Sequence, residues 1–359
     1  MTKKILLLAI LTLFIPFALI WDHQPAIASL PNGNRIKDPY AILRNGLPID
    51  QKDLRVIQNT LEETSDLVRG SRWPAITKAA SRSRSLLNSR KNQILESLPQ
   101  SKKKEGEEII VSLKNNLEIL TEEANSKNKS GFIDVRRKSL QEIGNLEALL
   151  LPGKFPYTIP NEFDSLPRLL GRAEVSIETT KGKMIAVIDG YNAPLTGGAF
   201  VDLANKGFYN GLPINRAEEF FVLQTGEPKG SDIGYIDPDT NEERHIPLEI
   251  RVEGESETLY NQTFEELGLY TANPVLPFAT LGTLGWAHSE NALDDGSSQF
   301  FFFLYEAELN PAGRNLIDGR NAAFGYVVEG NEILNELSVD DQIKSIKILN
   351  GLDKLQSNA

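Results

Sequence analysis

The sequence predicts a chain of more than one domain, in which a bundle of four helices precedes a domain of short strands that close into a barrel. Apolar residues recur at helical spacing through the first half of the chain. The second half holds short apolar runs and alternating segments with few helices, a pattern typical of closed barrels. The net charge also changes sign between the two halves.

The first residues have the pattern of an export signal. Two lysines precede an apolar run over residues 5–20, and Ala26 and Ala28 are the small residues that a signal peptidase reads. The alternative is a membrane anchor, but the run is shorter than the roughly 20 residues that span a bilayer. We therefore expect a signal peptide over residues 1–28, and a mature chain from Ser29 that is exported and lacks a transmembrane segment.

Composition excludes several kinds of site. The chain contains no cysteine, so it forms no disulfide, thiol nucleophile or zinc–thiolate centre. Its three histidines are His23, His245 and His288, too few and too scattered to favour a histidine zinc site. We expect no metal and no cofactor.

The two halves carry opposite charge. Residues 29–160 contain 22 Lys and Arg against 16 Asp and Glu, whereas residues 161–359 contain 14 against 32. The net charges of +6 and −18 attract each other, which favours an intramolecular contact between bundle and barrel. Alternatively, each half addresses a different partner, or each is simply a solvated surface.

The first half predicts four amphipathic helices joined by short connections, which form an antiparallel bundle over residues 29–151. The helical runs are residues 50–68, 73–98, 107–125 and 130–151. Two basic clusters, at 102–104 and 136–138, are either solvated helix faces or sites for acidic surfaces, and no nucleic acid is expected. Four prolines make residues 152–168 a semi-rigid connector.

The second half, residues 169–359, predicts mainly strands. Segments 173–180 and 183–188 read as a hairpin. Thr196 is a candidate cap for the short helix that follows. Three further strands are expected at residues 220–223, 300–304 and 343–349.

Four separated motifs carry a family resemblance. Arg216 and Gln224 flank the apolar run at 220–223, and Ser298-Gln299-Phe300-Phe301, Asp318-Gly319-Arg320 and Phe324-Gly325 follow. In this order and at these separations they resemble the cyclophilins, a family of peptidyl-prolyl cis-trans isomerases, over about residues 171–351. The resemblance implies an eight-stranded barrel capped by helices.

The resemblance also implies the site. Arg216 matches the catalytic arginine, and Gln224 lies beside it as the second catalytic residue. Eight residues match substrate-binding positions: Phe221, Val222, Ala287, His288, Gln299, Phe301, Leu316 and Asn321.

Several positions depart from the family pattern. Val222 replaces the usual methionine, and Leu316 stands at a tryptophan position. Asn215 and Asn321 each replace a histidine, and His288 replaces an asparagine. These departures predict an isomerase of low activity.

The chemistry requires no nucleophile. Resonance raises the barrier to rotation about an X–Pro bond to roughly 18–20 kcal/mol, and a donor aimed at the prolyl nitrogen stabilises the twisted amide. Arg216 is always charged and can supply that donor. The alternative is that Arg216 forms a surface salt bridge with Glu218 or Glu219. Phe220, Phe300 and Phe302 are expected to be ordinary core residues.

The whole layout resembles the large thylakoid-lumen cyclophilins of plants and their cyanobacterial relatives, whose bundle is similar to the extrinsic photosystem subunit Q. This implies a location in the thylakoid lumen or the periplasm, proline-containing segments of client proteins as substrates, and photosystem II subunits as partners. Two functions stay open. The chain is an isomerase that assists folding or assembly of photosystem II, or a non-catalytic binding factor whose groove is vestigial or covered by the bundle.

Overall fold

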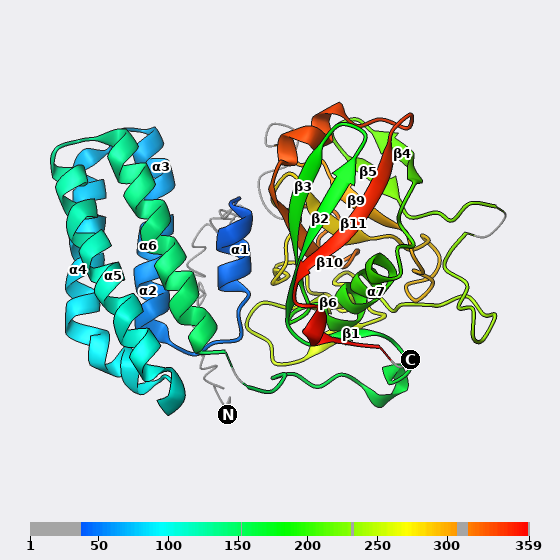
Figure 1. Ribbon diagram of the computed structural model, residues 1–359, viewed down its shortest axis with the longest axis horizontal. Coiled ribbons are helices and arrows are strands. Elements are labelled where there is room, and N and C mark those ends of the chain that lie inside the picture. The colour runs from blue at the N-terminus through cyan, green and yellow to red at the C-terminus, as the bar shows by residue number, and fades with distance from the viewer. Residues whose placement is uncertain (1–36, 152, 231–232, 307–314, 358–359) are drawn as a thin grey trace, which may run out of the picture.

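The computed structural model describes residues 37–151, 153–230, 233–306 and 315–357. The predicted signal peptide lies outside these residues. A helical bundle lies at one end of the molecule and a β-barrel at the other, with the short helix α1, Pro39–Asn45, between them (Figure 1). Within the described ranges, none of the helices combines the length and the apolar character needed to cross a bilayer.

The bundle contains the predicted helices, with one interruption. The helices are α2 Lys52–Glu62, α3 Thr64–Arg69, α4 Trp73–Glu96, α5 Lys103–Asn125 and α6 Lys129–Leu149. The first predicted helix is two helices, because the chain turns at Glu63, which ends α2 and precedes α3. Residues from all five helices, such as Leu54, Leu117 and Ile143, are fully buried or nearly so in one core.

Eight antiparallel strands form the closed barrel, in the order β10-β3-β2-β11-β4-β5-β9-β8. The barrel strands are β2 Arg172–Thr179, β3 Lys183–Asp189, β4 Leu212–Glu218, β5 Val222–Thr225, β8 Thr283–Trp286, β9 Phe300–Phe303, β10 Ala323–Glu329 and β11 Gln342–Asn350. Two small ribbons accompany it, namely β1 Arg168–Leu169 with β12 Leu355–Gln356, and β6 Glu249–Arg251 with β7 Thr258–Tyr260. The predicted hairpin and the strands predicted at 300–304 and 343–349 are therefore present, whereas the strand predicted at 220–223 begins at Val222 and runs to Thr225.

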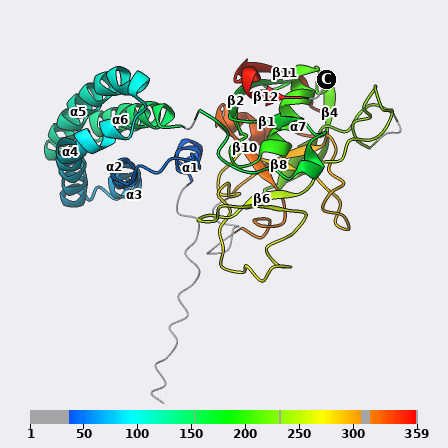
Figure 2. The same ribbon diagram turned by 90° about the horizontal axis from the view of Figure 1, so that it is seen from below.

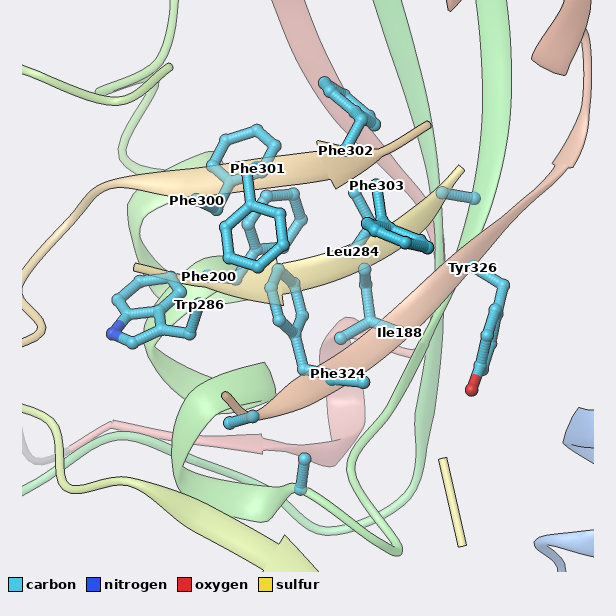
Figure 3. Close-up of a cluster of buried hydrophobic side chains, with 14 of the residues drawn as sticks. Ile188, Phe200, Leu284, Trp286, Phe300, Phe301, Phe302, Phe303, Phe324 and Tyr326 are labelled. Atoms are coloured by element: carbon cyan, nitrogen blue, oxygen red, sulfur yellow. The ribbon is translucent and has the colours of Figure 1, made fainter. Parts of the chain in front are cut away.

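Aromatic side chains fill the barrel. Helix α7, Pro194–Asn205, contributes Phe200, whose ring lies 5.1 Å from that of Phe300 and 5.2 Å from that of Phe324 (Figure 3). Phe300 and Phe302 are fully buried, as predicted. The Phe200–Phe300 pair is edge-to-face, an arrangement that adds stability beyond the area that it buries.

The predicted cap of α7 is wrong. Thr196 lies inside the helix, which begins at Pro194 and has no side-chain cap of its own. The first N–H groups are instead satisfied from a distant strand, because the buried Glu249 carboxylate of β6 accepts from the backbone of Leu195 and Thr196 at 3.0 Å each. A contact with a distant strand therefore takes the place of a local side-chain cap.

Helix α1, Pro39–Asn45, was not predicted, and it packs on the barrel rather than on the bundle that follows it. Ile42 and Leu43 are 3% and 4% exposed and belong to the core of the barrel. The barrel also binds two backbone carbonyls of this segment. Arg172 of β2 donates to the carbonyl of Leu43, and the Asn192 amide donates to that of Gly46 at 2.8 Å.

The bundle holds the same segment from the other side. Arg55 of α2 donates to the carbonyls of Arg44 at 2.6 Å and Leu47 at 2.9 Å. Its guanidinium also contacts the fully buried Glu147 of α6 at 3.0 Å. Arg44 in turn binds Glu62 of α2 at 2.9 Å. Bundle and barrel therefore share α1 as a common element (Figure 2).

We predict that Glu147→Gln flattens the pH dependence of stability. Burial raises the pKa of the Glu147 carboxyl from its usual 4.5 to about 7, against the opposing effect of Arg55. The folded chain therefore holds this proton more tightly than the unfolded chain, and the resulting stability is largest below pH 4.5 and is lost as the pH rises through 7. Urea unfolding followed by helical circular dichroism should show a shallower fall between pH 5 and 8 in the variant, by about one proton. Equal slopes would contradict the assignment.

Candidate active site

Arg216, Gln224 and Phe301 lie in one row on the outer face of the barrel. Arg216 of β4 pairs with Gln224 of β5, which pairs with Phe301 of β9, which pairs with Gly285 of β8. Paired residues of adjacent strands place their side chains on the same face of a sheet. The strand register therefore brings together residues that the sequence spreads over 216–301.

The row has an aromatic floor. The Phe301 ring stacks on Phe278, with centroids 5.8 Å apart and an angle of 14° between the planes. A side chain at Gly285 could not coexist with this floor, because its Cβ would lie 2.2 Å from the Phe301 ring. The buried Asp318 carboxylate accepts from the Phe278 backbone N–H at 2.8 Å, so the Asp-Gly-Arg motif positions the floor.

Arg216 forms the salt bridge that the sequence left open, and its partner is Glu218. The Glu218 carboxylate lies 2.7 Å from Nε and 2.6 Å from Nη2 of Arg216, whose side chain is 47% exposed. The remaining nitrogen, Nη1, lies 3.5 Å from Oε1 of Gln224. One arm of the guanidinium thus faces the glutamine while the other two nitrogens face the carboxylate.

A chain of amides fixes Gln224. Its Nε2 donates to Oε1 of Gln299 at 2.7 Å, and Asn215 donates to the same oxygen at 3.2 Å. Gln299 Nε2 donates to the Ile233 carbonyl at 3.0 Å, which fixes which way its amide points. Asn215, noted only as a departure from the family pattern, therefore belongs to the site, and it also binds Glu227 at 2.9 Å.

The far wall is joined to this network through the backbone. The Ala287 N–H donates to the Gln299 carbonyl at 3.1 Å, and the Asn321 amide lies 3.4 Å from the carbonyl of Trp286. The ring nitrogens of His288 lie 2.7 Å from the Ser289 carbonyl and 2.9 Å from that of Arg320. The His288 ring therefore bridges two loops beside Asn321.

The remaining predicted site residues differ in exposure. Val222 is buried opposite Phe303, and Phe221 is 37% exposed with its ring edge-to-face against Phe303 at 6.2 Å. Leu316 is 75% exposed in the turn before Asp318. It is the most exposed of the ten predicted residues, at the position where the family pattern has tryptophan.

Sequence reasoning missed Phe278, Gly285 and the role of Asn215. Phe278 lies in a segment without strand periodicity, and only the folded structure brings it under Phe301. Gly285 is one of 27 glycines, and nothing local distinguishes it.

Phe220 is not a core residue, contrary to the prediction. It is 52% exposed and lies in the turn from β4 to β5, which the Phe221 N–H closes on the Glu218 carbonyl at 3.0 Å. Its φ of 61° is in the left-handed region, which a bulky side chain rarely adopts. The turn between β4 and β5 places Phe220 at the surface instead of in the core.

We predict that Phe220→Gly stabilises the barrel by about 1 kcal/mol, since relief of left-handed strain exceeds the entropy that glycine adds to the unfolded chain. Phe221→Gly is the matched control. Phe221 lacks a positive φ and is partly buried, so this change should destabilise the protein. Urea unfolding followed by tryptophan fluorescence checks both, and equal losses in the two variants would show that Phe220 is not strained.

Comparison with known proteins identifies both halves. Residues 174–351 match the cyclophilin type peptidyl-prolyl cis-trans isomerase family, and residues 38–151 match the PsbQ-like domain of CYP38-like peptidyl-prolyl cis-trans isomerases. A Cryptosporidium parvum cyclophilin structure aligns over 49% of this chain and 99% of its own at 21% identity and a TM-score of 0.34.

Two relatives align over nearly the whole chain. A Synechocystis protein that carries the name thylakoid lumen peptidyl-prolyl cis-trans isomerase is 45% identical over 93% of this chain and 88% of its own length. The chloroplastic isomerase CYP38 of Arabidopsis thaliana is 39% identical over 92% of this chain and 78% of its own. With this identity over this length, the chain belongs to the cyclophilin-type peptidyl-prolyl cis-trans isomerases that carry an N-terminal PsbQ-like domain.

Proposed function

We propose that the chain isomerises X–Pro bonds at the row of Arg216, Gln224 and Phe301. The observation that carries this proposal is a guanidinium held beside an amide, over an aromatic floor, on the outer face of the barrel. The Phe301 and Phe278 rings offer an apolar surface on which a proline ring can pack. Arg216 supplies a donor for the prolyl nitrogen, and Gln224 supplies a partner for the neighbouring carbonyl.

The transition state loses amide resonance and leaves a lone pair on the prolyl nitrogen. A donor that is already in place there stabilises the twisted amide without reorganisation. The amide chain through Gln299 keeps Gln224 oriented before substrate arrives. Val222 and Phe221 would bound the groove on one side, and Ala287, His288 and Asn321 on the other, with Leu316 at its rim.

The ion pair with Glu218 supports low rather than absent activity. Both partners are about half exposed, and such a pair is worth about 0–1 kcal/mol in free energy. Pulling Arg216 away from Glu218 to meet a substrate would then slow the reaction by at most about fivefold. The departures at Asn215, Leu316 and Asn321 would have to account for any larger loss.

We predict that Arg216→Ala lowers kcat/KM for a proline-containing test peptide by about 100-fold or more, the usual scale for removing one preorganised donor. Arg216→Lys is the control, because it keeps the charge but loses the planar fork of donors, and it should be nearly as impaired. A protease-coupled or NMR exchange assay on the full mature chain measures both. Full activity in Arg216→Ala would remove Arg216 from the mechanism.

The relatives support a proposal for the compartment and the client. Their names place one in the thylakoid lumen and another in the chloroplast, and the bundle matches a PsbQ-like domain. We therefore propose that this chain works in the thylakoid lumen, on proline-containing segments of photosystem II subunits during their folding or assembly. Membrane fractionation tests this location. If the protein is recovered only from the periplasm, the proposed location is wrong.

The second candidate is a binding or assembly factor without catalysis. The contact between Arg216 and Glu218 favours it, because two of the three guanidinium nitrogens face a carboxylate in the free protein. In one form of this proposal the bundle covers the groove. The contacts that join bundle and barrel run through α1, which meets β10 and β2, whereas the row lies on β4, β5 and β9.

We predict that weakening the contact between the bundle and α1 leaves the isomerase rate within about twofold of the unmodified chain, because α1 meets the barrel at β10 and β2 whereas the row lies on β4, β5 and β9. Arg55→Ala removes the hydrogen bonds to the carbonyls of Arg44 and Leu47 and leaves the Arg44–Glu62 ion pair, and Arg82→Ala changes an exposed arginine of α4 as the control. Circular dichroism must show that both variants are folded. A large rise in kcat/KM for Arg55→Ala alone would support a groove covered by the bundle.

A further inference from the structure

A second cavity lies at the end of the barrel, beside the turn from β4 to β5. Its volume is about 450 Å³, within the range of about 300–1,000 Å³ that ligand-binding cavities occupy. Its lining comes from four separate stretches, namely the end of β4 with the turn and β5, Leu281 before β8, the residues after β9, and the 3-10 helix Asn331–Glu336 with the residues that follow it. None of the ten predicted site residues lines it.

The walls of this cavity are made of leucines. Leu223, Leu334 and Leu337 are 2%, 1% and 7% exposed and form part of the barrel core. Leu281 and Leu304 are only partly buried, so the apolar wall reaches the surface. An apolar side chain entering from outside would extend the existing core.

The mouth of the cavity is acidic. Glu218 and Glu219 of the turn are exposed and line it, Glu306 lines it as well, and Glu336 and Asp340 flank other lining residues in the sequence. Because Glu218 already binds Arg216, we assign the negative charge of the mouth to Glu219. A leucine wall under a negative mouth repels anionic ligands and favours apolar ligands with a positive charge.

The mouth already receives one cation. The ammonium of Lys37 lies 5.2 Å from the centre of the Tyr305 ring, which lines the cavity. A cation over an aromatic face at this distance is attracted by the ring. The strained and exposed Phe220 also lines the cavity, so two aromatic rings stand at its mouth.

We propose that this cavity docks a polypeptide segment of a partner protein in which a lysine or arginine stands next to a leucine-sized apolar residue. The apolar side chain enters between Leu304 and Leu337, and the cation meets Glu219. The site recognises no proline, and its binding does not rest on isomerase activity.

Fluorescence anisotropy of the chain from Ser29, with a labelled proline-free peptide of alternating leucine and lysine, tests the proposal. We expect binding that weakens with added salt. Glu219→Lys should weaken it about three- to tenfold, whereas Glu257→Lys, an equal charge change at an exposed residue outside the cavity, should leave it unchanged. Leu304→Gln, checked for folding by circular dichroism, should also weaken it.

Four outcomes would overturn the proposal. One is equal binding of a leucine–glutamate peptide, and another is an equal effect of Glu219→Lys and Glu257→Lys. The third is that the peptide binds only after the residues before Lys37 are removed. That result would mean that the cavity takes a segment of this chain instead of a partner protein. Displacement of the peptide by a prolyl test peptide would likewise contradict a separate site.

Discussion

Hydrogen bonds to the carbonyl groups at the end of α1 determine how the two halves of this protein are joined. The last carbonyls of any helix have no partner inside it, and a seven-residue helix is not stable alone. Here Arg55 of the bundle satisfies the carbonyls of Arg44 and Leu47, while Arg172 and Asn192 of the barrel satisfy those of Leu43 and Gly46. The family match assigns α1 to the PsbQ-like domain, yet its apolar residues pack in the barrel core.

The candidate active site depends on strand register in a similar way. Arg216, Gln224 and Phe301 share a face only because β4, β5 and β9 pair as they do, and a shift of one residue would turn a side chain to the other face. Gly285 and Phe278 then set the height of the floor, and Asp318 holds Phe278. The polar and apolar parts of the row are thus positioned by separate contacts.

The sequence predicted those elements whose signal is local. Long amphipathic runs gave the helices at 73–96 and 103–125, and alternation gave the hairpin at 172–189. Helix α1 was missed because seven residues span too few helical turns to show a helical period. The cap of α7 was misassigned because Glu249 lies 53 residues beyond Thr196 in the sequence. The sequence could have distinguished Glu218 from Glu219 as the partner of Arg216, because residues two apart on a strand share a face.

The position of α1 in the chain has a consequence for the order of events during synthesis. The contact from Leu43 to Arg172 spans 129 residues, and the whole bundle is made between them. At the usual rate of translation, α1 leaves the ribosome about 6 to 26 s before the strand that will bind it. The bundle can form its own core in that interval, because its buried residues lie between Leu54 and Leu149. Ile42 and Leu43 meanwhile remain without the barrel core, so the nascent chain presents a short apolar segment to chaperones until β2 has been made.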